Sequence, residues 1–329
     1  MASTVIQSIT KTNTLNVAGL MYAKSDETTK FLDAIYARGK GTRKVNDIEF
    51  VLSAGYSLAT PAQPAITEDA SITGATPETT QRSNTTNCGQ IYQRAVEVSY
   101  LKQATTGRMS GLNQEGSRNN VQDELDFQIA MRMKQMKMDF NYTCINGVYQ
   151  QSTGTNVAWK SRGIIAGITT NVVDATDQTL GKDMITSAVT EAIKNGFVWE
   201  DGRMEMWVNP SMLEKINDAW AGLTGFSQPA TRTEGGVAIT SLYTYFGVIN
   251  VYYDAAFPAD TIAILNMGEI GTVETDVPGK GCWFYEDISK QGASEGGQVF
   301  GIAGLDYGAE QRHILIQNIG ATSEGDLGG

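Results

Sequence analysis

The sequence predicts an α+β protein, in which one long helix, a mixed helix and strand unit and a final run of strands follow one another. Three observations carry this prediction: a helical apolar pattern over residues 117–147, alternating helix and strand patterns over 175–266, and mostly strand patterns over 267–320. The length of 329 residues fits one large domain or two joined ones. The 41% hydrophobic and 19% charged content is typical of a folded chain with a substantial core.

Composition also limits the classes of function. No stretch reaches the roughly 18 consecutive apolar residues of a membrane span, and the N-terminus lacks the pattern of a secretory signal. We therefore expect no membrane partner and folding in a cytoplasm. Cys88, Cys144 and Cys282 are widely spaced, which favours free thiols over a disulfide framework. His313 is the only histidine, so we expect no zinc site, no other metal and no cofactor.

Charge is distributed unevenly along the chain. Residues 1–46 hold seven Lys or Arg and three Asp or Glu, a net charge of +4, so the remainder of the −11 chain carries −15. This asymmetry suits a basic arm lying on an acidic surface, either its own or a neighbour's, and a plain solvated N-terminus is the alternative. The acidic remainder disfavours a protein that grips nucleic acid, because such proteins neutralise phosphates.

The pattern in residues 25–39 predicts a short helix within this arm. Ser25 can cap its N-terminus, Gly39 can end it, and Phe31, Leu32 and Ile35 form one apolar face. A helix this short is marginal alone, so the apolar face must dock on another part of the protein.

Residues 51–90 predict a projecting two-stranded ribbon. Twelve of these 40 residues are Ser or Thr and few are large and apolar, so the segment cannot form its own core. Ile66-Thr67 and 71–73 are the strand-like pieces, and three prolines confine strands to edges or ribbons. A disordered linker is the competing interpretation.

The long helix over 117–147 is the strongest local signal. Its apolar stripe recurs at spacings of four or three residues, its interior has no Gly or Pro, and Gly147 can end it. The stripe comprises Val121, Leu125, Ile129, Met133, Met136 and Phe140. A helix of about 45 Å with a second apolar stripe (Phe127, Met131, Met138) needs cover along its length. We expect Asp at Ile129 or Met133 to abolish folding; a coiled coil is the alternative.

The remaining elements alternate and then become strands. A strand is predicted over 91–100, helices over 182–195 and 209–220, and strands over 204–208, 248–253 and 261–265. Asn209 and Pro210 have the residue types of a helix cap and a first helical position. Two further strands are predicted over 298–303 and 313–319, and a disordered tail over 321–329.

One catalytic motif needs weighing. Gly292-Ala293-Ser294-Glu295-Gly296 matches the G-x-S-x-G of serine hydrolases, and Asp306 and His313 follow in that family's order. The mechanism requires the serine on a sharp strand-to-helix turn, whereas a strand is predicted after Ser294. A hydrolase using Ser294 is therefore a remote alternative, and we predict no catalytic residues and no enzyme activity.

The order of parts resembles a known family. A basic N-terminal arm, projecting ribbon, long helix, α/β unit and return strands resemble the major capsid (major head) proteins of tailed bacteriophages, with the Hong Kong 97-type fold. The stretches that carry the resemblance are PAITEDASITG (61–74, in part), QIYQRAVEVSY (90–100), DELDFQIAMRMKQMKMDFNYTCING (123–147) and FGVINVYYDAAFPADTIAILN (246–266). It spans about residues 15–320.

The resemblance implies a division of the chain. Residues 1–46 would be the N-terminal arm, 47–92 the extended loop over a neighbouring subunit, and 93–174 a peripheral domain with its spine helix at 117–147. Residues 175–266 would form the axial domain, and 267–320 the return strands of the peripheral domain, followed by the tail at 321–329.

The resemblance also implies a function. The chain would self-assemble as hexamers and pentamers into an icosahedral head, in the host bacterial cytoplasm, and would end in the virion. Partners would be the portal and scaffolding or decoration proteins, with packaged double-stranded DNA only in non-specific proximity. The alternative within the same fold is the shell of an encapsulin-like nanocompartment.

Overall fold

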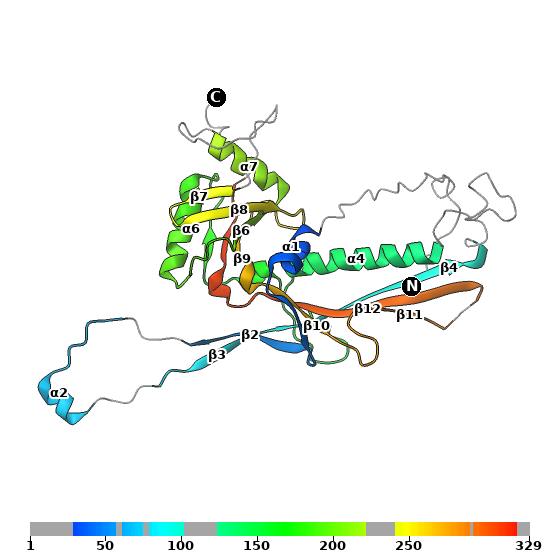
Figure 1. Ribbon diagram of the computed structural model, residues 1–329, viewed down its shortest axis with the longest axis horizontal. Coiled ribbons are helices and arrows are strands. Elements are labelled where there is room, and N and C mark those ends of the chain that lie inside the picture. Colours follow the sequence, from blue (N-terminus) through cyan, green and yellow to red (C-terminus); the bar gives the residue numbers. More distant parts are fainter. Residues whose placement is uncertain are drawn as a thin grey trace.

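The computed structural model describes residues 29–56, 61–74, 79–101, 124–221, 241–289 and 292–320. One long helix lies along a long sheet, a second sheet with helices stands beside them, and a thin ribbon projects away from both (Figure 1). The two sheets and the ribbon have the strand orders β1-β10-β12-β11 with β4 also on β12, β5-β13-β9-β6-β8-β7, and β2-β3. The α+β class predicted from the sequence is confirmed.

The long sheet is built around β12 (Ser294–Asp306). Along one edge, β4 (Gln90–Ser99) pairs with it antiparallel from Ser294↔Ser99 to Ala303↔Gln90. Along the other edge lie β10 (Gly271–Thr275) and β11 (Phe284–Asp287), and β1 (Gly41–Val45) pairs parallel with β10. The N-terminal strand and the C-terminal part of the chain therefore share one sheet.

Helix α4 (Glu124–Asn146) packs on this sheet with only part of the predicted stripe. Met136 and Phe140 are 2% exposed, and Phe140 lies edge-on to Tyr92 with ring centroids 5.5 Å apart. Met133 is 48% exposed, so the expectation that Asp there abolishes folding is wrong. Met133 and Phe140 differ in direction by only about 20° around the helix. The difference in exposure therefore comes from position along α4.

The cover over the end of α4 is helix α1 (Lys30–Arg38). The backbone N–H of Leu32 donates to Asn141 Oδ1 at 2.9 Å, and Phe31, Leu32 and Ile35 are buried as the sequence predicted. The structure places the cap position at Thr29; Ser25, Val121 and residues 117–123 of the expected long helix lie outside the described residues.

The second sheet has six strands and is covered by helices. It contains β5 (Val172–Asp174), β13 (Ile314–Gln317), β9 (Ile262–Asn266), β6 (Met204–Val208), β8 (Gly247–Tyr253) and β7 (Ser241–Thr244). Its helices are α6 (Lys182–Lys194) and α7 (Pro210–Ala221). Asn209 Oδ1 accepts from the N–H of Ser211 at 3.1 Å, which confirms the predicted cap.

The second sheet also corrects one expectation. Residues 267–320 were expected to return to the long sheet, but β13 pairs with β9 and β5. Ile314, Leu315 and Ile316 are all buried, as in a strand covered on both faces. The short elements α5 (Ile164–Gly167), η3 (Met267–Glu269) and η4 (Glu310–Arg312) complete the body.

The predicted ribbon is present as β2 (Glu49–Tyr56) paired antiparallel with β3 (Arg82–Cys88). Its far end carries α2 (Glu68–Thr73), where strand pieces at 66–67 and 71–73 were expected. Thr67 Oγ1 accepts from the N–H of Ala70 at 3.2 Å, and this cap favours the helix over a strand. No residue of α2 is buried.

Candidate functional site

The residues of the hydrolase motif are not brought together. Ser294 and Asp306 are the first and last residues of β12, about 40 Å apart at the rise of an extended strand. Ser294 Oγ donates to Glu97 Oε1 at 2.7 Å, on the neighbouring strand. A nucleophile needs its base within hydrogen-bond reach, so Ser294, Asp306 and His313 form no catalytic triad.

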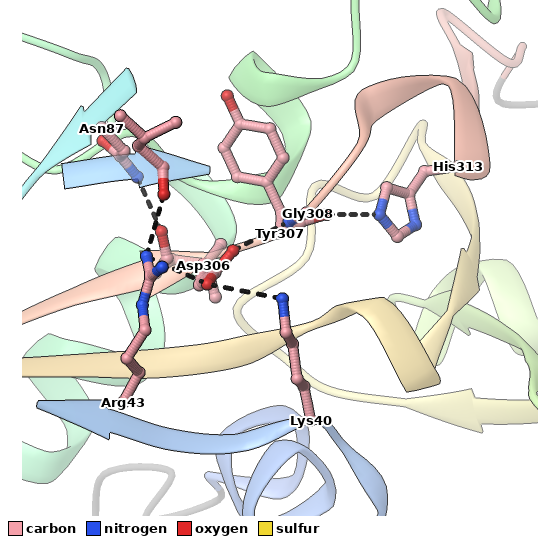
Figure 2. A network of polar contacts seen from close by, with 9 residues as sticks. Lys40, Arg43, Asn87, Asp306, Tyr307, Gly308 and His313 are labelled. Carbon is pink, nitrogen blue, oxygen red and sulfur yellow. Dashed lines mark hydrogen bonds and ion pairs between the residues drawn. The ribbon is translucent and has the colours of Figure 1, made fainter. Parts of the chain in front are cut away.

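Asp306 and His313 instead belong to a buried polar junction between the two sheets (Figure 2). Asp306 is 2% exposed and lies 3.3 Å from the Arg43 guanidinium and 3.9 Å from Lys40 Nζ, both at β1. Its Oδ1 accepts from the N–H of Gly308 at 3.1 Å. A carboxylate removed from water needs such partners, so Asp306 has a structural role.

His313 is fully buried on the other side of this junction. Its Nε2 lies 2.8 Å from the carbonyl oxygen of Tyr307, and its Nδ1 accepts from the N–H of Asn266 at 3.3 Å. Burial lowers the pKa of His313 to about 4. The imidazole is therefore neutral near pH 7. It links Tyr307, which follows β12, to Asn266 of β9.

The base of the ribbon is joined to the body by Asn87. Its Nδ2 donates to the carbonyl oxygens of Arg162 at 3.0 Å and Leu305 at 2.8 Å, and its Oδ1 accepts from the N–H of Arg162 at 2.8 Å. Asn87 is 0% exposed, and its side chain therefore fixes β3 both to Arg162, just before α5, and to β12. Sequence reasoning missed Asn87, because a single Asn in a Ser/Thr-rich run gives no local signal.

A shallow hollow lies between α1 and β8. Trp207 contributes to its lining, Lys30 Nζ stands 3.3 Å from the centroid of the Tyr253 ring, and Arg38 lies 4.6 Å from that of Tyr252. Arg38 also donates to both carboxylate oxygens of Glu205, at 2.6 and 3.0 Å. The charges of Lys30 and Arg38 are therefore paired within the subunit, as is typical of cation–π pairs with a structural role.

The cysteines also have structural surroundings. Cys88, Cys144 and Cys282 are free and buried, as predicted from their spacing. Burial raises the pKa of Cys88 and of Cys282 to about 11 and also raises the pKa of Cys144. Thiols in this state are poor nucleophiles and poor metal ligands. Within the described ranges, no group of three or more His, Cys, Asp or Glu side chains could hold a metal ion.

The remaining candidate site is surface that the subunit leaves uncovered. Apolar side chains are exposed on the ribbon and its tip, on the β7–β8 hairpin, and at two positions of α4. They include Tyr56 at 67%, Ile66 at 71%, Ile72 at 80%, Tyr243 at 62%, Tyr245 at 85%, Met133 at 48% and Tyr142 at 60%. Large exposed apolar groups gathered on projecting elements are typical of protein–protein contact surfaces. No helix in the described ranges has the length and hydrophobicity of a membrane span.

Comparison with known proteins agrees with this picture. The family model of the SU10 major capsid protein matches residues 4–320. Among curated proteins no sequence matches. Among solved structures, the capsid of cyanophage A-1(L) is 13% identical, with a TM-score of 0.60 and coverage of 92% of this chain and 98% of that one.

Two further structures share the fold. A chain of the Mycobacterium phage Patience structure is 11% identical, with a TM-score of 0.55 and coverage of 90% of this chain and 85% of that one. The SrpI encapsulin of Synechococcus elongatus PCC 7942 is 10% identical, with a TM-score of 0.55 and coverage of 92% and 95%. The fold is thus the Hong Kong 97-type capsid fold that the resemblance implied. Because the family match spans nearly the whole chain, this protein belongs to the SU10 major capsid protein family and is the major capsid protein of a phage virion.

Proposed function

We propose that the chain assembles as hexamers and pentamers into an icosahedral head, through a ribbon that lies over a neighbouring copy. The observation that carries this proposal is the ribbon's lack of cover: Tyr56, Ile66 and Ile72 are each more than 60% exposed in the single subunit. Burying apolar area of this kind is the main driving force for association. Repetition of a modest contact around a closed lattice makes the shell stable.

We assign the other parts accordingly. Helix α4 and the long sheet form the peripheral domain, and the six-stranded sheet with α6 and α7 forms the axial domain around the five- and six-fold axes. The exposed aromatic residues of the β7–β8 hairpin, Tyr243 and Tyr245, support this assignment, since they give the axial domain an uncovered apolar end. Residues 1–28 would continue the arm.

The proposed partners follow from charge. The net charge of −11 favours a shell whose wall does not adhere to packed double-stranded DNA, so the DNA is a neighbour rather than a bound ligand. A portal, and scaffolding or decoration proteins, would be the protein partners, with assembly in the host cytoplasm. We propose no catalytic role for the chain.

The ribbon's proposed role can be tested by shortening it. Asn87 and Cys88 are 0% exposed, so the cut must leave the ribbon's base intact. Gly55 pairs with Ser83, and an Asn-Gly turn joining these residues in place of 56–82 would close a two-residue hairpin. We expect a folded subunit that unfolds cooperatively in urea, as the natural subunit does, but forms no closed shells in electron micrographs. Normal shells from this variant would contradict the proposal.

Point variants make the same test without deletion. Ile66→Ser combined with Ile72→Ser removes the apolar tip and should greatly lower shell yield. Gln63→Ala changes an exposed polar residue on the same tip and should leave the yield unchanged. Equal yields from the two variants would mean that the apolar tip is not a contact.

A second candidate function is the shell of an encapsulin-like nanocompartment, which the SrpI encapsulin's shared fold supports. Purified shells distinguish the two functions. Packaged double-stranded DNA within shells from infected cells supports the phage head, whereas a co-purifying enzyme cargo supports the nanocompartment.

A further inference from the structure

The ribbon leaves the body at a kink in β2. Val51 pairs with Thr86 and Ser53 with Thr85, so Leu52 is an extra residue without an opposite partner in β3. This is a β-bulge, a feature that bends a strand and increases its local twist. The bulge lets Leu52 be 7% exposed and keeps it in the main core, while the strand beyond it is exposed.

The side of the kink that faces the body is held by apolar contacts. Phe50 is 6% exposed and belongs to the same core as Leu52. A side chain at Gly304 on β12 would come within 3.1 Å of the Phe50 ring, so Gly304 provides the space in which Phe50 packs. The ribbon's base is therefore seated on β12, but these contacts end at Leu52.

One polar side chain spans the kink itself. The guanidinium of Arg43, on β1, donates to the carbonyl oxygen of Val51 at 3.0 Å, at the first residue of the bulge. The same guanidinium lies 3.3 Å from the buried carboxylate of Asp306 and 5.7 Å from the centroid of the Phe50 ring. Arg43 thus joins the bulge to an acidic anchor at the end of β12. Figure 2 shows its contact with that anchor, Asp306.

The geometry of these contacts suits arginine alone among the basic residues. A planar guanidinium offers several donors in fixed directions, so it can donate to a carbonyl while it remains paired with a carboxylate. Lys40, just before the same strand, lies 3.9 Å from Asp306. It can balance the charge of Asp306, but no bond links it to the ribbon within the described contacts.

We infer that Arg43 is the positioning residue of the ribbon: by tying the bulge of β2 to Asp306, it sets the direction in which the ribbon leaves the body. This inference rests on the proposed role of the ribbon as the contact with a neighbouring copy. A ribbon that must reach a fixed place on a neighbour binds more tightly when its direction is set in advance.

The direction of the ribbon can be measured in the unassembled subunit. Spin labels on Arg82→Cys, at the outer end of β3, and Thr190→Cys, on α6, report it as a distance distribution by double electron–electron resonance. The natural cysteines are buried and react slowly, so they need not be removed. The test variant is Arg43→Ala. The matched control is Lys44→Ala, because Lys44 is the next residue of β1, carries the same charge and bonds the exposed Asp276 at 2.7 Å.

We expect a narrow distribution in the natural chain and in Lys44→Ala, and a distribution about twofold wider or shifted in Arg43→Ala, since one charged hydrogen bond is lost at the kink. Shell yield should fall in Arg43→Ala only. An unchanged distribution in Arg43→Ala would overturn the inference, even if shortening the ribbon abolishes shells. A wider distribution with normal shells would instead support the positioning by Arg43 and overturn the ribbon's proposed role.

Arg43→Ala should fold, because Lys40 remains beside Asp306. If Arg43→Ala gives no soluble subunit, the same distance distribution is measured in Arg43→Gln instead. Its amide can still donate to Val51 but carries no charge for Asp306, so we expect a distribution intermediate in width. A distribution as narrow as that of the natural chain would then overturn the inference.

Discussion

The neutral state of His313 makes the stability of the subunit depend on pH. In the folded chain Nδ1 accepts from the N–H of Asn266, so the ring proton is on Nε2 and points to the carbonyl oxygen of Tyr307. A second proton on Nδ1 would face that N–H. Protonation therefore breaks one hydrogen bond and places a charge where no solvent reaches.

The size of the effect follows from the pKa. Burial lowers the pKa of His313 from 6.5 to about 4; the hydrogen bond to Tyr307 and the charge of Glu310 oppose this shift, and the charge of Arg312 adds to it. Below pH 6.5 the unfolded chain takes up a proton that the folded chain refuses, so stability falls as the pH falls. The loss reaches about 2 kcal/mol at pH 5 and about 3 kcal/mol near pH 4.

The assay is urea unfolding of dilute, unassembled subunit at pH 7.5 and pH 5. This window isolates His313, because it is the only histidine. Burial would raise the pKa of Glu310, but hydrogen bonds from Thr170 and Thr169 lower it overall, and its contribution is lost only below its usual 4.5. His313→Gln should be less stable at pH 7.5, since the N–H of Asn266 loses its acceptor, but equally stable at both pH values. A natural chain equally stable at both, or an undiminished pH dependence in the variant, would refute this reasoning.

Two further predictions concern packing. Phe140→Ala should lower the free energy of unfolding by about 3–5 kcal/mol, and Met133→Ala by less than about 1 kcal/mol, since only the first side chain is buried; urea unfolding of both variants measures the difference, and equal losses would contradict the packing of α4. Gly301→Ala should displace the Trp283 ring, which lies against the glycine, and a tryptophan emission spectrum identical to that of the natural chain would contradict that packing.

Local patterns predicted the elements that a single apolar face or a cap defines. The face of Phe31, Leu32 and Ile35 gave α1, and the Asn209-Pro210 pair gave the start of α7. These signals lie within a few residues of each other, so they can be recognised without knowing the fold.

The features that depend on distant residues could not be predicted in this way. Met133 belongs to the same stripe as Phe140, but only Phe140 lies where the rings of Tyr92 and Trp283, from distant parts of the sequence, cover it. The buried run of β13 would fit either sheet, and its partners β9 and β5 lie far away in sequence. The burial of Asp306 could not be predicted, because its partners Arg43 and Lys40 come from a distant part of the sequence.

The basic excess of the first 46 residues now has a structural explanation in its described part. Arg38 pairs with Glu205 of the second sheet, whereas Lys40 and Arg43 pair with Asp306 of the long sheet. Residues 29–45 therefore lie on the protein's own body, which is one of the two placements expected for the basic arm, and connect its two sheets.

That connection limits how the subunit can change shape. The N–H of Phe31 donates to Asp254 Oδ2 at 3.0 Å, and Asn141 Nδ2 donates to the same oxygen at 3.1 Å. Helices α1 and α4 therefore share one buried carboxylate, which directly follows β8 of the second sheet. A rotation between the sheets would break this bond set and leave buried charges unpaired, which is costly. A shell places identical subunits at slightly different angles, and the adjustment must come from elements outside these bonds. The β7–β8 hairpin is a described element that meets this condition, and it carries the exposed side chains of Tyr243 and Tyr245.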